Sequence, residues 1–243
     1  MKDLIATSYP QVNRVSEFLG DIQPEVLQDM LYIKRIRGEG EVIEDAWSSR
    51  RKGDNTVFSS IATGMTKIVL FPKDCEDVVF KIPYFGEELY VYSDDDDGLE
   101  LYDTREFSEA ADGDYCKREE KLFRLAVQSR VDRFFAQTEY VTTLLGYIPL
   151  YASERCEAFE ERDEERRYSL LGCTGVPKDI EDMLIERYSP DELARLAGFL
   201  QENHISDLHS GNWGMSSNGD VKILDYSGFF EEDSLEVEIN GLR

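Results

Sequence analysis

Histidine and cysteine, the residues that build most zinc sites and disulfides, are scarce in this chain. Its 243 residues include two histidines and four cysteines, and the cysteines (Cys75, Cys116, Cys156 and Cys173) lie far apart with no CxxC pair. A zinc site needs several Cys and His ligands at close spacing, and a disulfide framework needs more cysteines than these. The small number and wide spacing of the cysteines and histidines therefore argue against both. We therefore expect reduced thiols and a cytoplasmic protein.

Long apolar runs and positive charge are also lacking. No run approaches the ~20 apolar residues of a membrane-spanning helix, and the N-terminal MKDLIATSYP lacks the apolar segment of a signal peptide. The 27 Lys and Arg residues face 51 Asp and Glu residues, which gives a net charge of −24. Such a surface repels nucleic acid and anionic membranes, so we expect neither as a partner. The composition does not indicate an oligomeric state.

The segment 205–228, ISDLHSGNWGMSSNGDVKILDYSG, carries the strongest chemical signal. Asp207 is followed five residues later by Asn212, and Asp225 comes thirteen residues after that. A proton-accepting carboxylate beside an amide and a second carboxylate suits phosphoryl transfer, because the amide and the second carboxylate can hold magnesium.

A hairpin is predicted between the amide and the second carboxylate. Asn218-Gly219 favours a tight type I′ turn, because both central positions of that turn require φ > 0. The paired strands would be Met215–Ser217 and Val221–Leu224, and pairing them brings the two ends of the segment together.

In these residues the chain resembles the protein-kinase-like superfamily. The family pattern is a catalytic-loop Asp, an Asn five residues later, a short hairpin, and a metal-binding Asp near a Gly. The motif DLHSGN resembles the corresponding loop of the aminoglycoside-phosphotransferase and atypical-kinase branches. The run HSGN followed by SNGD is similar to small bacteriophage protein kinases. The chain departs from the pattern at Ile205, where the family often has His, and at Gly228, which comes one place late.

The resemblance implies roles for these residues. Asp207 would accept the proton of the attacking hydroxyl, and Asn212 and Asp225 would hold magnesium on the phosphates of ATP. The acceptor would be a protein Ser or Thr hydroxyl or a small-molecule hydroxyl, and the phage-kinase similarity favours protein.

The resemblance extends upstream to a lysine, a glycine and a glutamate. The run VVFK ending at Lys81 looks like the kinase strand V-A-I-K, whose lysine contacts the α- and β-phosphates. Gly64 lies where the glycine-rich turn is expected, although ATGMT contains one glycine. A helix predicted over 115–129 carries Glu119, which would pair with Lys81. Three alternatives stay open: Glu120 is the partner of the lysine, Lys81 is a solvent-facing lysine, or Glu119 is a surface glutamate.

The predicted fold is α+β and two-lobed, similar to protein kinases. Residues 1–55 would form an N-terminal helical extension. Residues 56–165 would form a kinase-like N-lobe with a mostly antiparallel sheet, and 166–243 a reduced, mainly helical C-lobe with the catalytic loop and the metal-binding hairpin.

Two local features complete the expected organisation. Ser189, followed by Pro190 and by Glu192, predicts a helix that begins with a capping box and leads to the 205–228 segment. The acidic segment 87–114, with Asp94–Asp97 in a row, is expected to be a solvated loop.

The function that this sequence favours is transfer of the ATP γ-phosphate to a hydroxyl. One alternative is a pseudokinase that acts as a nucleotide-binding or purely interacting scaffold, which the single-glycine turn and the late Gly228 support. Another is an acidic inhibitor that mimics nucleic acid, which the net charge of −24 supports.

Overall fold

The computed structural model describes residues 4–31, 36–38, 41–42, 57–64, 66–85, 89–92, 99–102, 115–160, 166–167 and 175–227. The chain has an α+β fold that divides into two units. The hairpin unit comprises mainly Lys117–Glu139 and Ser153–Phe229, and the sheet unit mainly Asp3–Cys116 and Tyr140–Ala152. The predicted domains were contiguous ranges, whereas these units alternate along the chain.

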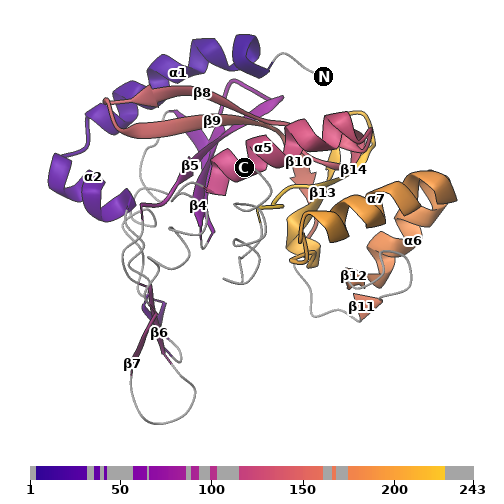
Figure 1. The fold of residues 1–243 in the computed structure, drawn as a ribbon. Helices are drawn as coiled ribbons and strands as arrows, with labels where there is room; N and C mark the ends of the chain where they lie inside the picture. The colour runs from indigo at the N-terminus through magenta and orange to yellow at the C-terminus, as the bar shows by residue number, and fades with distance from the viewer. Residues whose placement is uncertain are drawn as a thin grey trace, which may run out of the picture. The chain divides into compact units, whose positions relative to one another are not determined.

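The sheet unit is built on a five-stranded antiparallel sheet of order β3-β4-β5-β9-β8 (Figure 1). The strands are β3 (Phe58–Thr63), β4 (Lys67–Pro72), β5 (Val78–Pro83), β8 (Thr138–Leu144) and β9 (Ile148–Glu154). Continuous runs of apolar and β-branched residues in β4 and β5 make both strands predictable from the sequence, and residues on both faces of the two strands are buried.

Two helices pack on one face of this sheet. They are α1 (Leu4–Gly20) and α2 (Pro24–Leu31), both of which the sequence predicts. Their buried side chains, such as Val15 and Leu19, share a core with Ile68 and Phe80 of the sheet. The strand residues with the opposite parity therefore occupy the other face of the sheet.

Four short strands fall in segments that the sequence assigns differently. These are β1 (Ile36–Gly38), β2 (Glu41–Val42), β6 (Leu89–Tyr92) and β7 (Leu99–Tyr102), which form a sheet of order β2-β1-β6-β7. The helical prediction for 1–55 is therefore wrong at β1 and β2, and the loop prediction for 87–114 is wrong at β6 and β7. Pairing between β1 and β6, more than 50 residues apart, stabilises strands that local patterning does not reveal. Asp94–Asp97 lie outside the described residues.

The hairpin unit combines helices with a three-stranded sheet of order β10-β13-β14. Its elements are α5 (Tyr115–Gln128), β10 (Cys156–Ala158), α6 (Lys178–Arg187), α7 (Pro190–Glu202), β13 (Trp213–Ser216) and β14 (Val221–Ile223), with short strands β11 (Arg166–Arg167) and β12 (Val176–Pro177) and 3-10 turns at Asp132–Phe134 and Ser210–Asn212. A core that includes Phe135, Leu196, Trp213 and Ile223 joins the helices to this sheet.

The predicted capping box at the start of α7 is confirmed. The Ser189 hydroxyl accepts from the Glu192 backbone N–H, and the Glu192 carboxylate accepts from the Ser189 backbone N–H at 3.0 Å. Leu193, Leu196 and Leu200 form the buried stripe of the helix. Both the start and the orientation of α7 thus follow from local sequence.

Two further predictions concern cysteines and membranes. Cys75, Cys116 and Cys156 form no disulfide among the described residues, and Cys173 lies outside the described residues. In the part of the chain that the structure describes, no helix combines the length and apolar character needed to cross a bilayer.

Candidate functional site

The chain leaves α7 through a tight turn that positions the loop after it. His204 takes φ 53°, its N–H donates to the Gln201 carbonyl, and the Ile205 N–H donates to the Leu200 carbonyl at 2.9 Å. This is a Schellman motif, which caps the last carbonyls of the helix. Ile205 is buried and anchors the start of the loop. This apolar anchor stands at the position where the kinase pattern often has His.

The loop after Ile205 is closed by side-chain bonds to its own backbone. Asn212 donates its Nδ2 to the Asp207 carbonyl at 2.8 Å, and Trp213 donates its Nε1 to the Leu208 carbonyl at 3.2 Å. The Asp207 carboxylate remains 39% exposed, and His209 Nε2 lies 3.9 Å from its Oδ1, beyond hydrogen-bond distance. The loop backbone is therefore fixed while the carboxylate stays accessible.

The β13–β14 hairpin brings the chain at Asp225 back to the loop that contains Asp207 and Asn212. Trp213 pairs with Ile223 across β13 and β14, and the Leu224 N–H donates to the Asn212 carbonyl at 2.7 Å. Asp225, the next residue, accepts a hydrogen bond from the Ser227 hydroxyl at 3.1 Å. The fold thus brings Asp207, Asn212 and the start of the Asp225 segment together through backbone and side-chain hydrogen bonds.

Tyr226 holds the chain immediately after Asp225. Its ring is buried against Phe135 at 5.1 Å between centroids, and its hydroxyl donates to the Ala136 carbonyl at 2.7 Å. The Ala136 N–H in turn donates to the Ile223 carbonyl at 2.9 Å. These bonds tie the exit from β14 to the segment that follows α5, so the backbone on both sides of Asp225 is held.

The hairpin is present, but its turn type differs from the prediction. Gly219 has φ 82°, whereas Asn218 has no positive φ, and a type I′ turn requires both. The Gly219 N–H donates to the Ser216 carbonyl, and the Ser216 N–H donates to the Asp220 carbonyl. The connection is therefore a three-residue loop with one left-handed glycine, and β13 starts at Trp213 rather than Met215.

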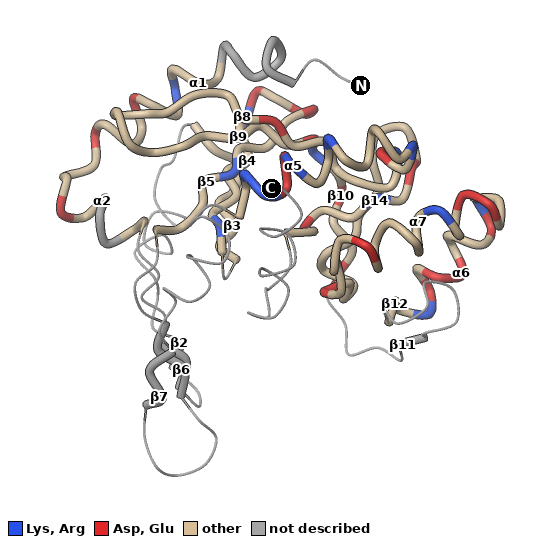
Figure 2. The backbone as a smooth tube through the Cα atoms, viewed as in Figure 1, with Lys and Arg blue, Asp and Glu red and all other residues tan. Residues whose placement is uncertain are grey.

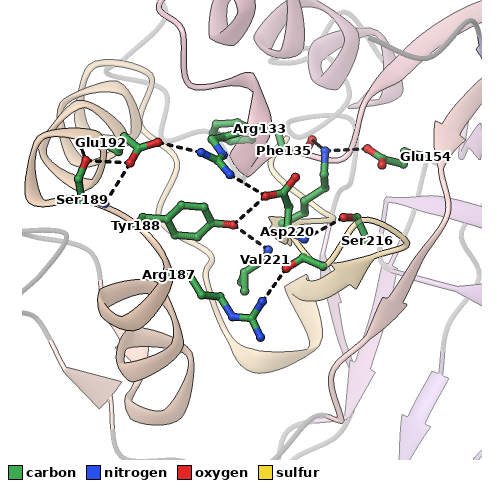
Figure 3. A network of polar contacts seen from close by, with 12 residues as sticks. Arg133, Phe135, Glu154, Arg187, Tyr188, Ser189, Glu192, Ser216, Asp220 and Val221 are labelled. Carbon is green, nitrogen blue, oxygen red and sulfur yellow. Dashed lines mark hydrogen bonds and ion pairs between the residues drawn. The ribbon is translucent and has the colours of Figure 1, made fainter.

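A network of charged and aromatic side chains fixes this turn (Figure 3). Arg133 donates to Asp220 Oδ1 at 2.9 Å and to Glu192 Oε1 at 2.8 Å, so it links the hairpin to the start of α7. Its guanidinium also lies 4.7 Å from the centre of the Tyr188 ring. Hydrogen bonding to Asp220 raises the pKa of Arg133 above its usual value.

Hydrogen bonds from Ser189 hold the pKa of the Glu192 carboxylate below the usual range. The capping box at the start of α7 therefore weakens when low pH protonates this carboxylate.

Tyr188 provides the buried part of the same network. Its hydroxyl accepts from the Val221 N–H at 3.0 Å and donates to Asp220 Oδ1 at 3.4 Å. Burial raises the pKa of the phenol. The folded state therefore holds this proton more tightly than the unfolded chain, so the stabilisation is present below the ordinary tyrosine pKa of about 10 and is lost as pH rises through the raised value.

Replacing Tyr188 by phenylalanine should destabilise the protein by about 1–3 kcal/mol, because the buried Val221 N–H loses its acceptor. Urea denaturation near neutral pH measures this change. The same variant should lose less stability than wild type above pH ~10, because it lacks the titrating phenol. Tyr140→Phe is the matched control, since Tyr140 is 40% exposed and its hydroxyl bonds Thr143. Equal stability of the two variants would contradict the role assigned to the Tyr188 hydroxyl.

The upstream residues predicted for the site lie in defined elements. Lys81 is in β5 and 5% exposed, and Glu119 is in α5 and fully buried. Glu120 forms an ion pair with Arg124 one turn later, at 2.7 Å. Lys81 belongs to the sheet unit and Glu119 to the hairpin unit, so their pairing stays a prediction.

Gly64 follows β3 in the turn to β4, as the sequence predicts. Its N–H donates to the Lys67 carbonyl at 2.9 Å. A Cβ atom added at Gly64 would lie 3.4 Å from that carbonyl oxygen, which is ordinary contact. The fold itself therefore does not demand glycine at this position.

Sequence reasoning missed the residues that position the hairpin. Arg133 and Tyr188 lie 87 and 32 residues from Asp220 along the chain, and Tyr226 bonds a carbonyl 90 residues away. No local pattern connects residues at such separations, so a single sequence does not reveal that Arg133, Tyr188 and Tyr226 contact the hairpin and its flanks.

Comparison of the chain with protein-family models, with curated proteins and with solved structures found no match.

Proposed function

We propose that this protein is a kinase-like phosphotransferase that moves the γ-phosphate of ATP to a hydroxyl, with protein Ser or Thr as the favoured acceptor. The observation that carries the proposal is the hydrogen-bonded arrangement of Asp207, Asn212 and the Leu224–Asp225 step. A proton acceptor beside an amide and a carboxylate is the set that phosphoryl transfer requires.

The amide and the carboxylate fit magnesium chemically. Magnesium prefers oxygen ligands and usually takes one or two carboxylates, with phosphates and water completing its shell. Because Asn212 commits its Nδ2 to the Asp207 carbonyl, the opposite side of the amide presents the oxygen that a metal needs. Asp225 would supply the carboxylate, and bound magnesium would neutralise charge on the phosphates.

Asp207 fits the role of proton acceptor. Its carboxylate is partly exposed, and its backbone is held by the bond from Asn212. A base must reach the hydroxyl that it deprotonates, so exposure combined with a fixed backbone suits this task. The same bond couples the position of the base to the position of a metal ligand.

The order of elements along the chain also supports the proposal. A strand pair joined at Gly64, a lysine strand, a helix bearing Glu119 and two further strands precede α7 and the loop, in the order that the kinase resemblance implies. Glu119 is the better candidate to pair with Lys81, because Glu120 already binds Arg124. In this proposal the two units are the two lobes of a kinase-like fold.

Incubation of the pure protein with γ-labelled ATP, magnesium and a mixed cell lysate tests the proposal. Transfer of label to protein would support the favoured acceptor, and transfer to small molecules would support the other acceptor class. If no label is transferred to any acceptor while Mg-ATP binds, the scaffold alternative replaces the proposal.

Magnesium and ATP together should raise the melting temperature. A ligand that binds the native state at about 100 times its Kd stabilises it by about 2.7 kcal/mol, which corresponds to about 5–10 °C for a chain of this size. ATP with EDTA should give a much smaller shift, because Asn212 and Asp225 would lack the ion that joins them to phosphate. An unchanged melting temperature at millimolar Mg-ATP, or an equal shift in EDTA, would contradict the proposal.

A further inference from the structure

Strand β14 of the hairpin unit carries a lysine between two buried apolar residues. Val221 and Ile223 are 0% exposed, and Lys222 between them is 8% exposed. Charged residues of this unit are frequent on its helices, as Figure 2 shows for α6 and α7, whereas lysine is rarely buried unless it is paired. Lys222 stands three residues before Asp225, so its contacts bear on the strand that leads to that carboxylate.

The ammonium group of Lys222 has two partners among the described residues. Its Nζ lies 2.8 Å from Glu154 Oε2 and donates to the Phe135 carbonyl at 3.1 Å (Figure 3). The side chains of Lys222 and Glu154 are 11% and 6% exposed, so little water reaches the pair. A carboxylate of the same unit therefore balances the lysine charge.

The Phe135 carbonyl belongs to a segment that contacts the chain on both sides of Asp225. Ala136, the next residue, donates its N–H to the Ile223 carbonyl at 2.9 Å. Its own carbonyl accepts from the Tyr226 hydroxyl at 2.7 Å. The bond from the ammonium group is therefore a third link between this segment and the chain around Asp225.

Glu154 connects the same lysine to the end of β9. Its N–H donates to the Gln137 carbonyl at 2.8 Å, and the hydroxyls of Ser153 and Thr138 lie 3.0 Å apart. The start of β8 and the end of β9 are thus bonded to each other at the points where the chain leaves and re-enters the hairpin unit. The pair of Lys222 and Glu154 fastens β14 to these points.

Directional contacts, rather than net stabilisation, explain a buried pair of this kind. The cost of removing two charges from water can exceed their attraction, so apolar side chains of similar volume are often as stabilising or more so. Apolar side chains do not supply hydrogen bonds that fix a distance and a direction. A catalytic carboxylate needs such fixing, because misplacement by about 1 Å can cost about 10²-fold in rate.

We infer that Lys222 is a positioning residue for Asp225, and that its buried pair with Glu154 holds β14 in the placement that presents the Asp225 carboxylate. The chemical task of Asp225 rests on the proposed function, whereas the fixing of β14 by the pair does not. Lys222 acts through the backbone of β14 and needs no contact with a ligand.

A double variant, Lys222→Met with Glu154→Leu, separates position from stability. Both replacements are apolar and similar in volume to the original side chains, so the melting temperature should equal or exceed that of wild type. The Leu224 N–H donates to the Asn212 carbonyl at 2.7 Å. Exchange of this amide hydrogen, measured by NMR, should nevertheless become about tenfold faster, because the end of β14 opens locally.

Two control variants accompany the double variant. Glu154→Gln retains an oxygen acceptor for the ammonium group, so exchange at Leu224 should stay within about threefold of wild type. Lys178→Met removes an exposed lysine at the start of α6 and should change neither quantity. Wild-type exchange at Leu224 in the double variant would overturn the inference. Failure of the double variant to fold would overturn it as well, because the pair would then be needed for folding rather than for position.

Kinetics separate this inference from the proposed function. If wild type transfers phosphate, the double variant should lose about tenfold to hundredfold in kcat/KM for ATP. If its kcat/KM and its exchange at Leu224 both equal those of wild type, the inference fails and the phosphotransferase proposal stands. If wild type transfers nothing, but exchange at Leu224 is faster in a double variant of unchanged melting temperature, the inference stands and the proposed function fails.

Discussion

Replacing Asp207 by alanine should lower the rate of phosphate transfer by about 10²–10⁴-fold, the usual contribution of general-base assistance. The substitution removes the proton acceptor but leaves the side chains of Asn212 and Asp225. It also leaves the Asp207 carbonyl, to which Asn212 donates at 2.8 Å. Affinity for Mg-ATP should therefore stay within about twofold of wild type. Single-turnover transfer and calorimetric binding measure the two quantities on the same preparation.

Asp191→Ala is the matched control for this experiment. Asp191 is an exposed carboxylate in the first turn of α7, in the same unit as Asp207. Its replacement should leave both transfer and binding unchanged. Because Asp207 is itself 39% exposed, neither variant should unfold. Equal transfer by wild type and Asp207→Ala would refute the catalytic role of Asp207.

Replacing Asp225 by alanine should abolish both transfer and the magnesium dependence of ATP binding. The change removes the carboxylate that would hold the ion, and even outer-shell substitutions at metal sites cost about 10–100-fold in metal affinity. ATP affinity in magnesium should fall to the value that wild type shows in EDTA. Titrations of ATP at several magnesium concentrations measure this dependence.

Ser227→Ala is an informative companion to Asp225→Ala. It removes the hydroxyl that donates to Asp225 Oδ1 at 3.1 Å and keeps the carboxylate. It should weaken magnesium-dependent binding less than Asp225→Ala does. Magnesium-dependent binding that persists in Asp225→Ala would place the metal elsewhere and contradict the site.

The elements that local sequence determined are those stabilised by neighbours in the chain. The capping box of α7 joins Ser189 to Glu192, three residues apart, and the apolar and β-branched runs of β4 and β5 are complete within each strand. The spacing of Asp207, Asn212 and Asp225 around a hairpin is also local. These features could be predicted, because the interactions that form them span only a few residues.

The tertiary structure decided the features that depend on distant residues. The hairpin turn has one left-handed residue, Gly219, and its register is held by Arg133 and Tyr188 through Asp220. The short strands β1 and β6 exist because they pair with each other across more than 50 residues.

The buried pair of Lys222 and Glu154 shows the same division between sequence and structure. Lys222 lies in a hairpin strand that local sequence predicts, but only the tertiary structure brings its ammonium group to the Glu154 carboxylate at 2.8 Å. The amino-acid sequence by itself thus determined the segments and the candidate chemistry. Register and long-range hydrogen bonds, which arise only when distant segments pack, decided which side chains act together.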